Sequence, residues 1–222
     1  MENIMESLRI LIADDHQLVR NGIRALLQSH AGWEICGEAS TGREAVAQAI
    51  ELRPDIVILD ISMPDLNGVD AARRIRMASK KTEILILSMH YSDQLIREIV
   101  DSGVRGYILK SDSDHELLIA VETLARHKPF FTSKATEVIK SEFNTDEPLT
   151  KILKWLRNRV TSREREIIQL IAEGNRGKEI ASSLGISFKT VDSHRSNAMR
   201  KLELHNIAEL VRYAVRNEII DP

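Results

Sequence analysis

The sequence has very little cysteine, because Cys36 is the one thiol among 222 residues. A single cysteine cannot close a disulfide within the chain, so a disulfide-stabilised framework is excluded and a reducing compartment is expected. Cys36 lies in the apolar stretch WEICGE, where we expect it to act as a small buried hydrophobic residue.

Long apolar runs are also missing. No stretch of about 18 apolar residues occurs, so no membrane-spanning helix is expected. The first residues, MENIMESLRILIADD, have neither the basic start nor the cleavage site of a secretion signal. The chain also has no internal repeats and no low-complexity tracts. We therefore expect a cytoplasmic protein that does not contact a membrane.

The chain has a net charge of only −2, but its charges are unevenly spread. Residues 1–128 carry 15 basic and 20 acidic residues, whereas residues 176–201 carry six basic and two acidic residues. Such a local excess of positive charge is typical of a surface that approaches nucleic-acid phosphates. On charge alone, a solvated helix face explains the cluster equally well.

Hydrophobic residues make up 43 % of the sequence, and the length suits two small domains or one large one. In the first part of the chain, short β-rich runs alternate with helix-like segments. The expected strands are 8–13, 33–38, 55–60, 83–88 and 106–110, and the expected helices are 17–30, 42–52, 67–79, 92–102 and 114–127. This pattern predicts an α/β domain over residues 7–128, a flavodoxin-like doubly wound fold of five βα units with strand order 2-1-3-4-5.

Polar residues interrupt the pattern after residue 128, and residues 129–158 are expected to be a linker with helical segments, in which Trp155 packs against other residues. Residues 159–222 are expected to form an all-α domain with helices at 163–173, 177–184, 188–202 and 206–217. Capping boxes predict three helix starts, at Thr41 with Glu44, Ser113 with Glu116, and Thr161 with Glu164.

Acidic residues gather at two neighbouring strand ends of the expected sheet. Asp14 and Asp15 follow the first strand, and Asp60 ends the third. Ligands bind beyond the carboxyl ends of parallel strands, so three carboxylates are expected to converge there. Three neighbouring carboxylates can all remain ionised only if a positive charge lies beside them. Mg²⁺ suits such oxygens, and a carboxylate beside it can attack a phosphoryl group.

The ends of the other two strands add complementary groups. Ser88 ends the fourth strand and Lys110 the fifth, so a hydroxyl and a compact cation are available to phosphoryl oxygens. Each residue alone has an ordinary explanation, such as a helix cap for Asp15, a turn for Asp60 or a solvated lysine for Lys110. Their occurrence together at one sheet edge favours a phosphoryl site.

The stretches ILIADDHQLVRNGI, DIVILDISMPDLNGVD, ILILSMH and GVRGYILKSDS resemble the receiver domain of bacterial two-component response regulators. The resemblance implies that Asp60 accepts a phosphoryl group from a sensor histidine kinase. It implies Mg²⁺, or another divalent cation such as Mn²⁺, bound by Asp15, Asp60 and the main-chain carbonyl of Ser62, with Asp14 acting through water. It also implies phosphoryl contacts from Ser88 and Lys110 and a switch role for Tyr107.

Some of these residues have a second interpretation. Tyr107 is equally consistent with a strand aromatic that packs against the fourth helix. His16 and His90 lie near the acids and are expected to be surface or capping residues. The resemblance implies a phosphoacceptor rather than an enzyme, although the domain would catalyse its own phosphorylation and slow dephosphorylation.

The stretch VTSREREIIQLIAEGNRGKEIASSLGISFKTVDSHRSNAMRKLELHN resembles the LuxR-type helix-turn-helix of the NarL/FixJ group of response regulators. Helical spacing places Val191, Ala198 and Leu202 toward the core. The opposite face is polar and able to enter a major groove. The expected DNA contacts are Asp192, Ser193 and Ser196 at base edges, Lys189, Thr190, His194, Arg195 and Lys201 at phosphates, and Lys178 and Arg200 nearby.

The chain departs from this family at Arg176 and Gly177, where an Asn and a small polar residue are usual, which is expected to loosen the start of the scaffold helix. Asp192 is an acid that either accepts from a cytosine amine or repels phosphate, while His194 and Arg195 also have structural interpretations.

On the last helix, the apolar stripe of Leu210 and Val211 either packs on the domain core or forms a dimer contact on DNA.

Together the two resemblances imply a response regulator that dimerises on activation and binds paired half-sites in double-stranded DNA, with RNA polymerase as a further partner. Three other classes share parts of the pattern. A phosphohydrolase with an aspartyl nucleophile would carry a second acid two residues after Asp14, where this chain has His16. A constitutive DNA-binding protein would bind DNA fully in Asp60 variants, and a pure protein-interaction module is disfavoured by the polar recognition face.

Overall fold

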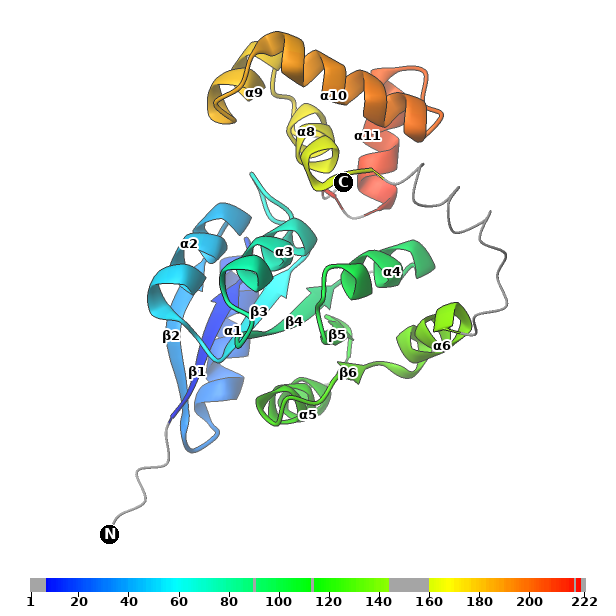
Figure 1. Ribbon diagram of the computed structural model, residues 1–222. Coiled ribbons are helices and arrows are strands. Elements are labelled where there is room, and N and C mark those ends of the chain that lie inside the picture. The colour runs from blue at the N-terminus through cyan, green and yellow to red at the C-terminus, as the bar shows by residue number, and fades with distance from the viewer. Residues whose placement is uncertain (1–6, 90, 113, 144–159, 218, 221–222) are drawn as a thin grey trace. The chain divides into compact units, whose positions relative to one another are not determined.

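The structure is a computed structural model that describes residues 7–89, 91–112, 114–143, 160–217 and 219–220 (Figure 1). The chain divides into two compact units, Met1–Ile139 and Lys140–Pro222. The predicted helix cap at Ser113, the predicted packing of Trp155 and residues 144–158, half of the predicted linker, lie outside the described residues.

The first unit alternates strands and helices, as the sequence predicts. Its strands are β1 (Leu8–Ala13), β2 (Trp33–Ala39), β3 (Ile56–Asp60), β4 (Glu83–Ser88), β5 (Gly106–Leu109) and β6 (Phe130–Phe131). Its helices are α1 (Gln17–Gln28), α2 (Gly42–Leu52), α3 (Gly68–Ala78), α4 (Asp93–Asp101), α5 (Asp114–Ala125) and α6 (Ser133–Phe143). The strands are parallel in the order β2-β1-β3-β4-β5-β6, so the predicted doubly wound fold and the order of its first five strands are confirmed.

The sixth strand is not predicted from the sequence. Gly106 and Tyr107 of β5 pair with Phe130 and Phe131 of β6. Helix α6 follows and buries Ala135 and Val138 in the same core as the sheet. Both elements come from residues that the sequence suggests are linker, so the first unit extends past residue 128.

Helices cover both faces of the sheet (Figure 1). Successive side chains of a strand point to opposite faces. Ile10 and Ile12 of β1 therefore pack with α1 and α5, whereas Leu11 and Ala13 pack with α2, α3, α4 and α6. With both faces covered, the strand ends become the places where polar side chains of the sheet meet solvent or ligand.

The loop after β3 is packed closely against its neighbours. A Cβ atom on Gly68 would lie 2.0 Å from the main-chain oxygen of Asp60, and a Cβ atom on Gly42 would lie 1.8 Å from that of Leu66. Neither position therefore tolerates a side chain. The side chain of Asn67 caps α3 by accepting from the main-chain N–H of Asp70. These contacts fix the chain direction immediately after the predicted phosphoacceptor.

The second unit is helical in its described part, with α8 (Ser162–Ala172), α9 (Gly177–Ser183), α10 (Phe188–Lys201) and α11 (Ile207–Arg216). Thr161 and Glu164 form the predicted capping box, with Thr161 Oγ1 accepting at 3.2 Å and Glu164 Oε2 at 2.8 Å. Two small cores hold the helices together, one around Ile168, Ala198 and Leu210 and one around Ile167, Ile180 and Val191. In the described part of the chain, no helix has the length and apolar character needed to cross a bilayer.

Candidate phosphoacceptor and DNA-binding sites

The acids predicted to converge belong to adjacent strands. Ala13 of β1 lies beside Leu59 of β3, so Asp14 and Asp60, which follow them, sit at the same edge of the sheet. Asp14 is fully buried and Asp60 is 2 % exposed. Two buried carboxylates at one edge repel each other and favour either a proton or a nearby cation.

Lys110 supplies that cation in this structure. Its Nζ atom lies 2.8 Å from Asp14 Oδ2 and 2.8 Å from Asp60 Oδ1. Its main-chain N–H donates to the carbonyl oxygen of Ser88 at 2.7 Å, which fixes the residue beyond β5 beside the end of β4. The side chains of Asp14, Asp60 and Lys110 thus form one buried cluster drawn from three strand ends.

Burial and the charges of neighbouring groups together set the pKa values of Asp60 and Lys110. Desolvation, together with the negative charges of Asp14 and Asp15, raises the pKa of Asp60 to about 6, although Lys110 acts in the opposite direction. Burial alone would lower the pKa of Lys110, yet that pKa is raised because Asp60 and Asp14 favour the charged ammonium. Near pH 7 Asp60 is therefore mainly ionised and Lys110 is protonated.

Asp15 lies at the more exposed side of the cluster. Its Oδ1 atom is 2.7 Å from Nδ1 of His16, while the main-chain N–H of His16 donates to Asp14 Oδ1 at 2.8 Å. One potential ligand atom from each of these three residues lies within 4.8 Å of the others. The sequence does not predict the contact between Asp15 and His16, because an expected surface histidine gives no signal of its partner.

The donor set fits a divalent cation. Asp14, Asp15 and Asp60 supply three carboxylates against the single ammonium of Lys110, which leaves a negative excess, and carboxylate oxygens are preferred by Mg²⁺ and Mn²⁺. Ser62 follows β3 by two residues and is partly exposed, on the loop next to Asp60.

Ser88 and Tyr107 lie deeper in the unit. Both are fully buried, and their strands are adjacent, with Ile86 opposite Tyr107 and Ser88 opposite Leu109. Tyr107 belongs to the core that contains residues of α4, which matches the packing interpretation of this residue. Ser88 ends β4 at the same edge as Asp60 ends β3.

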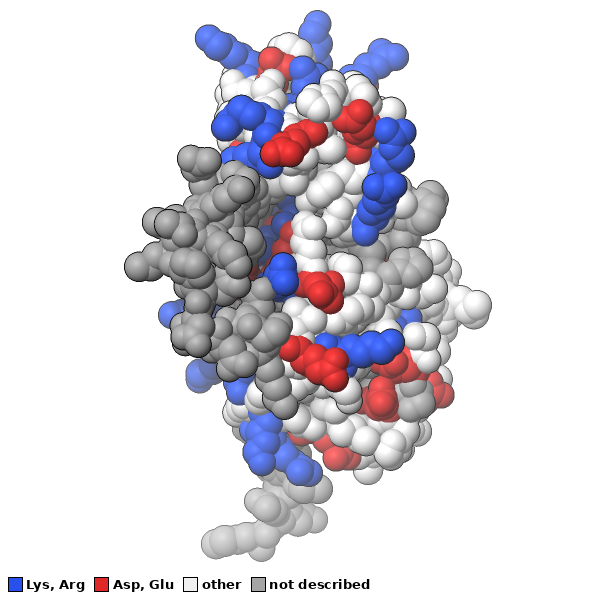
Figure 2. Space-filling view, turned by 90° about the vertical axis from the view of Figure 1, so that its right-hand side faces the viewer, with Lys and Arg blue, Asp and Glu red and all other residues white. Residues whose placement is uncertain are grey.

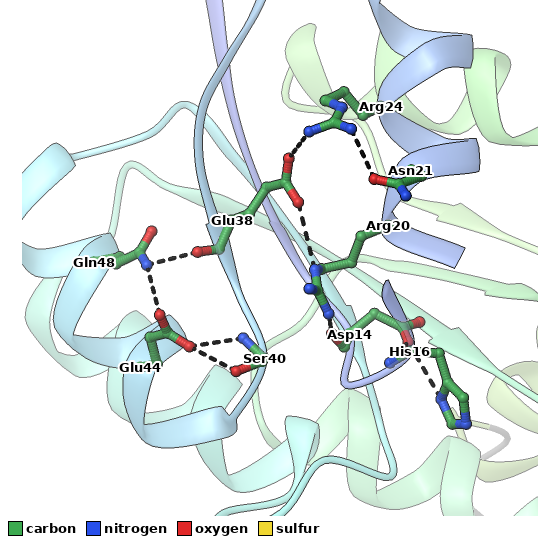
Figure 3. Close-up of polar contacts among 9 residues, drawn as sticks. All are labelled: Asp14, His16, Arg20, Asn21, Arg24, Glu38, Ser40, Glu44 and Gln48. Carbon is green, nitrogen blue, oxygen red and sulfur yellow. Dashed lines mark hydrogen bonds and ion pairs between the residues drawn. The ribbon is translucent and has the colours of Figure 1, made fainter. Parts of the chain in front are cut away.

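A polar network supports the acid pocket from the side of α1 (Figure 3). Arg20 donates from its guanidinium to the main-chain oxygen of Asp14 at 2.6 Å and pairs with Glu38 of β2 at 3.4 Å. Arg24 pairs with the other carboxylate oxygen of Glu38 at 2.7 Å. The side chain of Gln48 donates to the main-chain oxygen of Glu38 at 2.6 Å. Arg20 is thus a site residue that the sequence does not reveal, because its partner in the pocket is a main-chain atom.

The predicted recognition helix, α10, has one buried and one exposed face. Val191 and Ala198 are buried. The predicted DNA-contacting residues Lys178, Lys189, Ser193, Ser196 and Arg200 are exposed, while Thr190, Asp192, His194, Arg195 and Lys201 are partly exposed. Lys and Arg side chains project from this unit with acidic side chains among them (Figure 2).

Two residues that are predicted to contact DNA phosphates, Lys201 and Arg195, form ion pairs within the second unit. Lys201 Nζ lies 2.6 Å from Glu164 Oε2, and this pair helps to lower the pKa of Glu164 against the effect of burial. Arg195 lies 2.5 Å from Asp192 Oδ1, one turn earlier on the same helix. In this structure Lys201 therefore joins α10 to α8, and the negative charge of Asp192 is partly neutralised by its neighbour.

The departures at Arg176 and Gly177 lie at the capped start of α9, and the expected loosening of that start stays a prediction. The carboxylate of Glu179 accepts the main-chain N–H of Arg176 at 2.6 Å, which caps the first turn of the helix. A Cβ atom on Gly177 would lie 2.6 Å from the ring of Phe188. The start of the scaffold helix is therefore packed against the start of the recognition helix.

Leu210 and Val211 differ in their surroundings. Leu210 is fully buried in the core of the second unit, so here it stabilises the domain and offers no surface to a second chain. Val211 is partly exposed. Of the two residues of the predicted dimer contact, Val211 is therefore accessible to a second chain in this structure and Leu210 is not.

Comparisons with known proteins agree with both units. The family model "Response regulator receiver domain" matches residues 10–122, and "Bacterial regulatory proteins, luxR family" matches residues 158–214. The oxygen regulatory protein NreC of Staphylococcus haemolyticus is 36 % identical, covering 96 % of this chain and 100 % of that protein. The response regulator protein VraR of Staphylococcus aureus is 34 % identical, covering 96 % and 99 %.

A solved structure also resembles the whole chain. RcsB of Salmonella enterica serovar Typhimurium, bound to the promoter P1flhDC in the presence of phosphomimetic BeF3-, is 25 % identical, covers 93 % of this chain and 98 % of its own, and gives a TM-score of 0.66. The chain therefore belongs to the two-component response regulators of the NarL/FixJ type, with a receiver domain and a LuxR-type DNA-binding domain.

Proposed function

We propose that Asp60 accepts a phosphoryl group from a sensor histidine kinase. The observation that carries this proposal is the bridge from Lys110 to both Asp14 and Asp60 at the carboxyl edge of the sheet. A carboxylate of Asp60 attacks the phosphorus atom, the bond from phosphorus to the donor nitrogen breaks, and the freed imidazole takes up a proton. The pKa of about 6 keeps most of Asp60 ionised at pH 7 and thus nucleophilic.

The proposed cation site uses Asp15, Asp60 and the main-chain carbonyl of Ser62, with Asp14 acting through water. When bound, Mg²⁺ or Mn²⁺ would neutralise charge on the acids and on the phosphoryl oxygens. Lys110 lies close enough to Asp60 to shift its contact from the carboxylate to a phosphoryl oxygen. By the same chemistry, the domain is proposed to catalyse its own phosphorylation by a small donor and the slow loss of the group.

Phosphorylation is proposed to act as a switch because a phosphoryl group with about −1.5 to −2 charges replaces the single negative charge of the Asp60 carboxylate, beside Asp14 and Asp15. In this proposal the hydroxyl of Ser88 donates to the phosphoryl group, and Tyr107 changes position with it. The surface formed by α4, β5 and α5 then changes, and the receiver shifts its docking or dimerisation.

Two DNA-binding domains, one from each of two chains, are proposed to bind DNA together. Two chains would bind two half-sites about one helical turn apart, with α10 in the major groove and Val211 near the contact between chains. RNA polymerase is the proposed downstream partner. Because the target is genomic DNA, the cytoplasm is the proposed place of action.

The test is DNA binding with and without phosphorylation. A pool of duplexes with a random central segment is selected with the full chain after treatment with acetyl phosphate and Mg²⁺. Affinity for the enriched duplex is then compared among treated wild type, untreated wild type and treated Asp60→Asn. We expect treated wild type to bind at least tenfold more tightly than the other two, as two chains per duplex. Equal affinity of all three would contradict the switch and support constitutive binding.

A further inference from the structure

Phe188 is a large apolar side chain in an unusual place. It is the first residue of α10, follows the N-cap residue Ser187, and is 53 % exposed. Its neighbour Lys189 is also exposed. A single exposed apolar residue is common on protein surfaces and needs no explanation by itself. The contact between the ring of Phe188 and Gly177 distinguishes this residue from an ordinary exposed one.

The ring of Phe188 rests on Gly177, the first residue of α9. A Cβ atom on Gly177 would lie 2.6 Å from Cε2 and 3.1 Å from Cδ2 of the ring, so any other residue would displace it. Gly177 does not have a positive φ, and its backbone conformation does not require glycine. The absence of a side chain at Gly177 is therefore explained by the position of the ring.

This pair joins two choices that local structure does not require, a glycine at the start of a helix and an exposed phenylalanine, and such pairs are expected at functional sites. It also brings together the starts of α9 and α10, where Lys178 and Lys189 are exposed. Two cations beside an apolar ring match the surface of DNA, in which phosphates flank the base edges.

In helix-turn-helix proteins, residues at the start of the recognition helix approach base edges in the major groove. Among the base edges there, thymine presents a methyl group, which pairs with apolar side chains such as phenylalanine. We propose that Phe188 contacts the C5-methyl group of a thymine in each half-site, and that Gly177 sets the position of the ring. This inference rests on the proposed DNA-binding function and names a specificity residue within it.

The test replaces thymine by deoxyuracil, which removes only the methyl group. The phosphorylated full chain is used to select an enriched duplex, and each thymine of that duplex is then replaced singly. Binding of wild type, Phe188→Ala and Gly177→Ala is measured by fluorescence anisotropy. Ile50→Ala is the matched control, because Ile50 is 54 % exposed and lies on α2 of the first unit, which has no proposed contact with DNA.

We expect one thymine per half-site at which deoxyuracil weakens wild-type binding about fourfold, the effect of losing one buried methyl contact. The same replacement should leave binding of Phe188→Ala unchanged, have a smaller effect in Gly177→Ala, and retain its full effect in Ile50→Ala. An enriched duplex whose deoxyuracil effects are equal in wild type and Phe188→Ala would overturn this inference alone. Failure of the wild type to enrich any duplex would overturn the proposed DNA-binding function as well.

Discussion

The ammonium nitrogen of Lys110 lies 2.8 Å from a carboxylate oxygen of Asp60. The two residues are 50 positions apart in the sequence, and they meet because β3 and β5 flank β4 and end at the same edge of the sheet. The contact places a compact positive charge where a phosphoryl group on Asp60 would bring negative charge. The proposed chemistry depends on this relationship.

The pKa of Asp60 predicts how stability depends on pH in the absence of metal. Because this pKa is raised from 3.8 to about 6 in the folded state, the folded state binds the proton more tightly than the unfolded state. The stabilisation is fully present below pH 4 and is lost as the pH rises through about 6. In a chelator, Asp60→Asn should therefore be about 1–3 kcal/mol more stable than wild type at pH 7.5.

Urea denaturation of the full chain at pH 7.5 and pH 3.5 measures this difference. The two proteins should have nearly equal stability at the lower pH, where Asp60 is protonated in both the folded and the unfolded state. A variant that is less stable than wild type at pH 7.5 would show that the pair with Lys110 outweighs burial.

Arg20 and Arg24 provide a matched pair of substitutions. Both arginines contact Glu38, but only Arg20 also contacts the main-chain oxygen of Asp14. Arg20→Gln should weaken Mg²⁺ binding by about tenfold, since groups that orient ligands influence metal affinity to this extent. Arg24→Gln removes the same charge and should change the affinity less than threefold. Calorimetric titration with Mg²⁺ measures both, and equal effects would mean that Arg20 acts through charge alone.

Two lysines of α10 should respond differently to salt. Lys189 is exposed, so Lys189→Ala should reduce the slope of log Kd against log salt concentration by about 1, as the loss of one phosphate contact does. Lys201 is paired with Glu164, so Lys201→Met should leave that slope unchanged and lower the stability of the second unit. Anisotropy titrations at several salt concentrations decide between these roles. A reduced slope for Lys201→Met would show that Lys201 leaves Glu164 to contact DNA.

Adjacent residues of α11 should separate folding from dimerisation. Leu210 is fully buried, and Leu210→Ala should cost about 2–5 kcal/mol of stability. Val211 is partly exposed, and Val211→Lys should change stability by less than about 0.5 kcal/mol but weaken the binding of the second chain to DNA. Thermal denaturation and band-shift stoichiometry measure the two effects. Undiminished pairing of Val211→Lys on DNA would place the dimer contact elsewhere.

The convergence of the site could be predicted from sequence because strand ends follow from local patterns. Alternating strands and helices predict a parallel sheet, and with the flavodoxin-like strand order the ends that carry Asp14, Asp60 and Lys110 lie at one edge. The capping box of Thr161 and Glu164 was likewise visible because its partners are three residues apart. Such features depend on short sequence separations or on regular topology.

Other features depend on contacts that no local pattern records. Strand β6 has only two residues, Phe130 and Phe131, which is too short for an alternating signal. The pair of Lys201 with Glu164 spans 37 positions, and Arg20 contacts a main-chain atom, which every residue offers. The reason for glycine at Gly177 is an aromatic ring on the next helix. These relationships required the three-dimensional structure.

Intact mass measurement after incubation with acetyl phosphate tests the central claim most directly. Wild type and Asp60→Asn are each incubated with and without Mg²⁺, and the account predicts a gain of one phosphoryl group only for wild type with Mg²⁺. Because Asp60→Asn keeps the size of the side chain but removes the nucleophile, its failure to gain mass would assign the site. Folded wild type that gains no phosphoryl group under any of these conditions would contradict the phosphoacceptor role of Asp60.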